Sequence, residues 1–404
     1  MNYRLLAAAA LAAPIAVAHP AYAKPGDPVV VSDDLTIDPM FDGRLRYESV
    51  DQDNALRNAD AVTMRLRAGA EFKMHSLSLL VEGEGTLAIV DDYNDTNGNG
   101  TAYSVVADPD NIELNRFQLQ YKEGGSAVTI GRQRIILDNA RFVGNVGWRQ
   151  NEQTFDAIRG ETKVGPVSLD AAYAFGQKTI FGIDAGPRQN FQGDFYLLGA
   201  GVTAGPVNLK AFAYLLDYDD VLANSTQTYG ARATAAFPLG PSAKLNLAAS
   251  YARQMDFETS PLDYSADYIA AEAGVTFAGF GIKGGYELLG SDNGSAFRTP
   301  MATLHAFNGW ADVFLNTPAA GLEDIYVGAS YDFKDLKVLP GLKAAVTYHE
   351  FDSDVGSISY GSEWDASLGF KLGPVGVLVK YANYDASAFA VDTEKLWLDL
   401  AFSF

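Results

Sequence analysis

The sequence predicts an all-β fold, a transmembrane antiparallel β-barrel of 18 strands, with 16 strands as the alternative count. Apolar and polar residues alternate over long stretches, which places them on opposite faces of extended strands. These stretches run for about 9–11 residues, the length that a tilted strand needs to cross a bilayer. Short turns with Gly and Pro alternate with longer polar loops, a pattern typical of outer-membrane barrels.

The first element along the chain is a targeting segment. Arg4 supplies a positive start, residues 5–18 are apolar, and Ala21-Tyr22-Ala23 has the small-x-small pattern of a cleavage site. We therefore expect a secretory signal peptide. The apolar stretch is shorter than the roughly 20 residues of a membrane-spanning helix. The expected domains are a signal peptide (1–23), a periplasmic N-terminal segment (24–40) and a single outer-membrane barrel (41–404).

The strands are clearest where the alternation is strict. From Leu396 to Phe404 every second residue is apolar, and Lys395 and Asp399 belong to the other face. Similar alternation covers residues 62–73 and 363–372. One face is expected to contact lipid and the other to line water, with Tyr and Phe near the strand ends as interfacial girdles. A large soluble β-sandwich or propeller is the alternative interpretation of the same pattern.

The connections fix the strand count. Longer loops rich in Asp, Asn, Gly and Ser are expected at 91–111, 136–152, 177–192 and 290–322. Eight short turns and one free strand at each end give 18 strands. Proline cannot continue a ladder and glycine relieves the backbone at a tip. The turns are expected at Met74-His75, Glu123-Gly124-Gly125, Gly165-Pro166, Gly205-Pro206, Leu239-Gly240-Pro241, Gly279-Phe280, Pro340-Gly341 and Gly373-Pro374.

Composition excludes several classes of protein. The 404 residues contain no cysteine, so disulfide frameworks, thiol nucleophiles and cysteine-bound metals are excluded. The net charge of -20 argues against general nucleic-acid binding, which needs a basic face.

One region resembles a known family. The stretches TIGRQR (129–134), NARFVG (139–144) and WRQNEQTFDA (148–157) are similar to the alginate-export family of outer-membrane proteins. The resemblance implies an 18-stranded monomeric barrel in the Gram-negative outer membrane. It also implies diffusion of an anionic polysaccharide or related solute through an arginine-lined pore. No cofactor is implied.

Arginines are concentrated in the first part of the chain, where 12 of the 16 lie at or before Arg159. Alternation places five of them on luminal faces, where guanidinium groups could bind carboxylates in passing. These luminal arginines are Arg44, Arg46, Arg65, Arg67 and Arg116.

An equally weighted alternative makes two of these arginines part of the wall. Glu82 and Glu84 share the luminal face of the next strand. With a turn at Met74-His75, Arg67 would face Glu82 and Arg65 would face Glu84, and opposite charges across a ladder stiffen a sheet. Further luminal acids are expected at Glu48, Asp170, Glu363 and Asp365.

Four more arginines flank the third outer loop, which is long enough to fold into the lumen and set the constriction. These are Arg132, Arg134, Arg141 and Arg149. The face of Arg132 and Arg134 stays open, because both share parity with the apolar Ile130. Gly131 could mark a bulge that re-aims the strand.

The loop after residue 91 contains half of a calcium-binding motif. Asp95, Asn97 and Asn99 match its opening positions, but Val106 stands where a bidentate Glu is needed. A solvated loop is the favoured interpretation, with calcium as the alternative.

Enzymatic function is not expected. Apart from the expected signal peptide, the histidines are His75, His305 and His349. A barrel lipase around His349 is the strongest enzyme alternative, but no G-x-S-x-G stretch accompanies it.

The predicted function is an outer-membrane channel for passive diffusion or export of an anionic polysaccharide or oligosaccharide such as alginate. The first alternative is a general or small-nutrient porin for sugars or carboxylates with weak selectivity. A structural or adhesin barrel, with loop 290–322 facing partners, is a third possibility. Expected partners are outer-membrane lipid, lipopolysaccharide and the saccharide cargo, with a monomeric channel and no nucleic acid.

Overall fold

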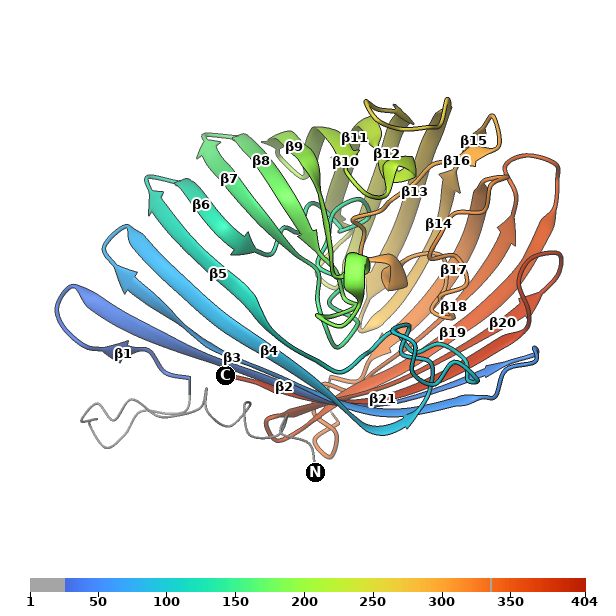
Figure 1. Ribbon diagram of the computed structural model, residues 1–404, viewed down its shortest axis with the longest axis horizontal. Coiled ribbons are helices and arrows are strands. Elements are labelled where there is room, and N and C mark those ends of the chain that lie inside the picture. Colours follow the sequence, from blue (N-terminus) through green and yellow to red (C-terminus); the bar gives the residue numbers. More distant parts are fainter. Residues whose placement is uncertain (1–25, 335) are drawn as a thin grey trace.

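The computed structural model describes residues 26–334 and 336–404 of the chain. The predicted signal peptide lies outside the described residues. Eighteen antiparallel strands form the wall of a closed barrel, as the sequence predicts (Figure 1). The last strand pairs with the first, for example through Leu400 and Leu45, and this pairing closes the wall.

The wall strands follow one another around the barrel in chain order. They are β2 (Leu35–Gln52), β3 (Ala59–Met74), β4 (Leu77–Asp92), β5 (Asn111–Glu123), β6 (Ser126–Gln133), β7 (Thr154–Val164), β8 (Val167–Lys178), β9 (Asn190–Ala204), β10 (Val207–Tyr218), β11 (Thr226–Pro238), β12 (Ala243–Asp256), β13 (Ser265–Phe277), β14 (Phe280–Leu289), β17 (Leu322–Asp332), β18 (Lys343–Asp352), β19 (Ser359–Leu372), β20 (Val375–Ala386) and β21 (Thr393–Ser403).

Short elements complete the structure. β1 (Val29–Val30) pairs with β2, and β15 (Ser291–Asp292) pairs with β16 (Ser295–Ala296) in a hairpin. The 3-10 turns are η2 (Gly186–Gln189), η3 (Leu222–Asn224) and η4 (Leu304–Ala306). Among the described residues, no helix has the length and apolar character needed to cross a membrane.

The first wall strand begins at Leu35, earlier than the predicted start near Phe41. Pro39 lies inside this extension, and Pro39 pairs with Ala70 on the β3 side only. β21 pairs with β2 from Asp42 onward, so the missing N–H of Pro39 breaks no ladder bond on that side.

Alternation sorts the side chains between lipid and lumen. On β21, Leu396 and Leu398 are about 40% exposed on the outer face, whereas Trp397 and Asp399 are buried on the inner face. The outer face carries apolar residues because no water satisfies polar groups in hydrocarbon.

Tyrosines occupy the outer face near the loop ends of the strands. Their hydroxyls donate hydrogen bonds to carboxylates on the same rim. The pairs are Tyr47–Asp60 (2.6 Å), Tyr173–Asp194 (2.5 Å), Tyr251–Asp267 (2.8 Å) and Tyr348–Glu350 (2.6 Å). An apolar ring with a polar tip suits the membrane–water interface.

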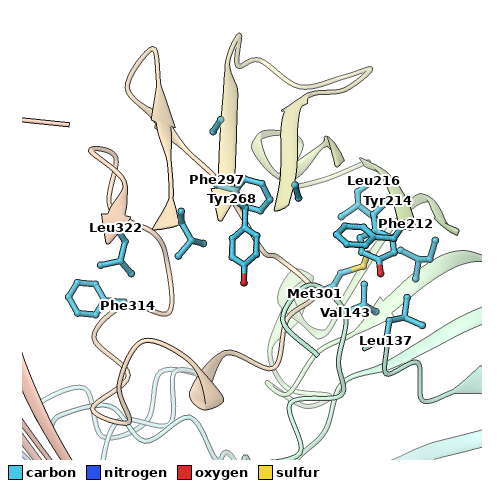
Figure 2. Close-up of a cluster of buried hydrophobic side chains, with 14 of the residues drawn as sticks. Leu137, Val143, Phe212, Tyr214, Leu216, Tyr268, Phe297, Met301, Phe314 and Leu322 are labelled. Atoms are coloured by element: carbon cyan, nitrogen blue, oxygen red, sulfur yellow. The ribbon is translucent and has the colours of Figure 1, made fainter. Parts of the chain in front are cut away.

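The barrel interior contains an apolar core. Phe212, Tyr214 and Tyr268 project inward from the wall, and Val143 and Met301 come from two loops that pack against them (Figure 2). The sequence predicts a water-lined inner face, and this expectation is wrong for the loop-side half of the barrel. The loops bring enough apolar surface to exclude water there.

Candidate functional site

The third outer loop, residues 134–153, folds into the lumen; we call it the first leaf. Its Arg149 Nη1 donates to Glu48 Oε2 on β2 (3.0 Å), and Gln150 Nε2 donates to Thr63 Oγ1 on β3 (2.8 Å). Arg141 Nε donates to Glu287 Oε1 on β14 (2.7 Å). Since β14 lies six strands from β2 around the eighteen-stranded wall, this leaf passes through the lumen from one part of the wall to another.

The loop of residues 290–321, the second leaf, enters from another part of the wall. Glu363 Oε1 on β19 accepts a hydrogen bond from the backbone N–H of Ala311 (2.8 Å). Asn308 Nδ2 donates to Asp324 Oδ2 on β17 (3.2 Å). The two leaves together occupy the loop-side half of the lumen.

Two of the predicted luminal arginines are engaged by the leaves and the wall. Arg46 is fully buried and makes a two-pronged contact with Asp399 (2.7 and 2.9 Å), with its guanidinium 4.0 Å from the Trp148 ring. Arg44 Nε donates to Gln150 Oε1 (2.8 Å). Arg46 therefore stabilises the wall through Asp399, and Arg44 helps to hold the first leaf through Gln150.

The predicted register between β3 and β4 is wrong by two residues. The turn consists of His75 and Ser76, with a φ of 51° at His75, so Met74 pairs with Leu77. Arg67 then faces Glu84 and forms an ion pair with it, instead of facing Glu82. A shift of two keeps each side chain on its predicted face.

The observed register also gives Arg65 and Glu82 partners other than the predicted ones. Arg65 faces Thr86 rather than Glu84, and its ion pair is with Asp42 on β2. Glu82 faces Arg116 and accepts from its Nη2 at 2.6 Å.

Below the first leaf lies a cavity of about 580 Å³, which we call the vestibule. Asn145, Gly147 and Glu152 of the first leaf form one side. Phe41, Ser403 and Phe404 mark the other, at the periplasmic ends of β2 and β21. Its charged lining comprises Arg44, Arg65, Arg67, Arg116 and Arg134 with the acids Asp42, Glu82 and Glu152. The arginines thus outnumber the acids.

The structure separates Arg132 from Arg134. Gly131 has a φ of 114°, a conformation that favours glycine, and Arg132 beyond it pairs with Phe117, which is half-exposed on the outer face. Arg132 forms a two-pronged contact with Asp156 (2.8 and 3.0 Å). Arg134 instead reaches the vestibule.

Glu152 accepts hydrogen bonds from three side chains around the vestibule. The donors are Arg134 Nε (2.6 Å), Asn115 Nδ2 (2.5 Å) and Asn145 Nδ2 (2.8 Å). Burial opposes its ionisation, but Arg67 and Arg134 outweigh burial and lower the pKa of Glu152 to about 2.

Several residues of the site carry no local sequence signal. The sequence pattern does not mark Glu152, Asn115 or Lys380 as site residues, and it marks His305 only as one of the few histidines. Asn115 occupies a bulge between β4 and β5, where Glu82 pairs with Arg116 but Gly83 pairs with Leu114. The bulge turns Asn115 inward beside Arg116, which period-two alternation does not allow.

The half calcium motif is held by its own hydrogen bonds. Asp95 Oδ1 accepts from the backbone N–H groups of Asn97 (2.8 Å) and Asn99 (3.1 Å). Asp95 Oδ2 accepts from Asn99 Nδ2 (2.7 Å). Within the described part of the chain, no group of three His, Asp or Glu side chains is arranged to hold a metal ion.

His349 lies between acids on the luminal face. Its Nδ1 is 2.9 Å from Asp324 Oδ1, and its Nε2 is 3.7 Å from Asp365 Oδ2. The predicted luminal acids Glu363 and Asp365 are buried here, Glu48 binds Arg149, and Asp170 binds Arg159.

Comparison with solved structures shows the fold. The chain is similar to Pseudomonas aeruginosa OccK9 (OpdG), at 16% identity and a TM-score of 0.72, over 91% of this chain and 98% of that one. It is also similar to Pseudomonas aeruginosa OpdO, at 16% identity and a TM-score of 0.70, over 91% of this chain and 97% of that one. A third similar structure is Pseudomonas aeruginosa OpdK with vanillate, at 15% identity and a TM-score of 0.69, over 91% of this chain and 98% of that one.

Sequence comparison identifies a family for part of the chain. The alginate export family matches residues 40–175, which include most of β2, the strands β3 to β7, the first leaf and most of β8. A search of curated proteins gives no significant match. The matched family and the porin fold both indicate a channel in the Gram-negative outer membrane rather than an enzyme. The predicted resemblance to the alginate export family is therefore confirmed over residues 40–175, within an outer-membrane channel of porin fold.

Proposed function

We propose that this channel conducts anionic saccharides, of the uronate type found in alginate, by passive diffusion through the arginine-lined vestibule. The observation that carries the proposal is the charge of the vestibule, whose lining holds five arginines and three carboxylates. A fourth acid, Glu84, pairs with Arg67 next to the lining, so one positive charge remains in excess. A carboxylate that enters from the periplasmic side meets an excess of guanidinium groups.

Arg116 and Arg134 are the groups best placed to meet solute. Their side chains are 14% and 28% exposed, whereas those of Arg46 and Arg149 are 0% and 7% exposed. Both also contact Glu82, so a sugar carboxylate would share guanidinium donors with an existing acid. Such sharing favours weak and reversible binding, which diffusion through a channel requires.

Blockade of single-channel current tests this proposal. Uronate oligomers added on the periplasmic side should interrupt the current of wild-type protein in a planar bilayer. Neutral oligosaccharides of equal length should not. The double variant Arg116→Gln/Arg134→Gln should weaken uronate block by roughly tenfold, on the scale of one lost charged contact. Equal block by neutral oligomers would contradict the proposal.

A matched variant controls for the loss of luminal charge. Arg232→Gln removes an arginine on β11 that contacts Ser250 (3.0 Å) and does not line the vestibule. It should leave uronate block unchanged.

A second candidate function is passage of small carboxylates. OpdK, one of the structures with the same fold, is described in complex with vanillate, a small aromatic acid. The same vestibule charges would serve such a solute. Block by monomeric carboxylates as strong as block by oligomers would favour this second candidate. We further propose a monomeric channel whose outer rim contacts lipopolysaccharide.

A further inference from the structure

The two leaves come from different parts of the wall but form one body. The first leaf joins β6 to β7, and the second joins β14 to β17. They meet along a seam, where Val143 and Met301 form a parallel bridge and the N–H of Gly144 donates to the carbonyl of Met301 (2.8 Å). Figure 2 shows Val143 beside Met301 in the barrel interior.

Further contacts close the seam at both ends. The N–H of Thr303 donates to the carbonyl of Ala140 (3.0 Å). Arg149 Nη2 donates to Asp312 Oδ2 (2.8 Å). Val143 and Met301 are 1% and 0% exposed, so the seam is closed to water at these two residues.

One wall lysine contacts both leaves at once. Lys380 on β20 is buried, and its Nζ lies 4.1 Å from the ring centroid of Trp148 on the first leaf and 3.6 Å from that of Trp310 on the second. Trp397 on β21 completes the cage at 5.6 Å. Three of the four tryptophans in the chain therefore surround one ammonium group.

His305 of the second leaf ties this cage to the seam. Its Nε2 is 2.6 Å from Lys380 Nζ, and its ring stacks on Trp148 at 4.3 Å. An ammonium group only donates, so Nε2 accepts and Nδ1 carries the proton that is donated to Asp312 (2.7 Å). Asp312 is the acid that also binds Arg149 of the first leaf.

We propose that the two leaves form a gate across the channel and that Lys380 is the latch that holds both leaves against the wall. Solute then passes when the leaves part at the Val143–Met301 seam. This inference rests on the channel function alone and not on the identity of the solute.

Variants of the latch test the proposal. Lys380→Met should lengthen or enlarge open events at least twofold and shift tryptophan emission to the red as the cage takes up water. Lys380→Arg keeps a cation in the cage and should behave as wild type. Lys283→Met is the control, because Lys283 pairs with Glu272 and has no described contact with either leaf. Equal open events in Lys380→Met, Lys283→Met and wild type would overturn the proposal.

A disulfide across the seam tests the gate without removing the latch. Bridge partners lie within reach of a disulfide, and the chain has no other cysteine to interfere. Oxidation of Val143→Cys/Met301→Cys should suppress open events, and a reductant should restore them in the same channel. The same disulfide should cancel the effect of Lys380→Met. Open events that are identical in the oxidised and reduced forms would overturn the proposal.

Discussion

Replacement of Glu152 by Gln should loosen the first leaf and raise anion preference. Gln keeps the shape of the side chain and can still accept from Asn115, but it removes the charge that faces Arg134 and Arg67. An ordinary glutamate pKa of 4.5 lowered to about 2 corresponds to about 3 kcal/mol in favour of the ionised, docked state at neutral pH. Because the pKa is depressed, this stabilisation is present above about pH 4.5 and is lost as pH falls toward 2.

Hydrogen exchange measures this loss locally. A loss of about 3 kcal/mol should speed exchange of protected amides in residues 134–153 by roughly 100-fold at pH 7. The vestibule then holds five arginines against two acids, so the reversal potential should move toward that of chloride. Glu161→Gln is the control, because Glu161 pairs with Arg159 on the periplasmic side of β7 and is 42% exposed. Unchanged exchange in 134–153 together with unchanged ion preference would refute the role given to Glu152.

Three further predictions follow from the fold and the charges. Arg67→Glu should lower the free energy of unfolding of the barrel, measured in urea, by about 3 kcal/mol, because it breaks the buried Arg67–Glu84 ion pair. Adding Glu84→Arg to this variant should restore most of the lost stability, whereas adding Glu82→Arg should not. Leu398→Arg, on the lipid face of β21, should lower the free energy of unfolding in lipid by about 2–4 kcal/mol, and a similar stability to wild type would contradict its placement. Burial lowers the pKa of His305 from 6.5 to about 3, while Asp312 opposes this shift and Lys380 adds to it. Because a released His305 takes up a proton more readily than the docked one, docking of the second leaf should weaken by about 2 kcal/mol at pH 5 relative to pH 7. Open events should increase on acidification, and His305→Gln should flatten that dependence.

The strand count was predictable because period-two alternation and turn residues are local signals. The Gly-Pro pairs at 165–166, 205–206 and 373–374 lie at hairpin tips as expected. The connection between β17 and β18 is longer than the predicted Pro340-Gly341 turn and spans residues 333–342. The β3–β4 register was missed because it depends on which two residues form the turn, and neither Met74-His75 nor His75-Ser76 contains the glycine that usually marks a two-residue turn.

The path of the leaves was not predictable from local pattern. Arg149 and Glu48 are 101 residues apart, and Arg141 and Glu287 are 146 apart. No periodicity within residues 134–153 encodes these partners. The arginine-rich composition did mark the region, but which arginines remain open to solute depends on partners such as Glu152 and Asp399. Luminal arginine content alone therefore overstates the positive charge of the pore.

The reversal potential of purified wild-type protein in a planar bilayer under a salt gradient tests the central claim most directly. The excess of arginines in the vestibule predicts a preference for chloride over potassium, reduced in Arg116→Gln/Arg134→Gln and unchanged in Arg232→Gln. A preference for potassium in wild-type protein would contradict an anion-conducting vestibule.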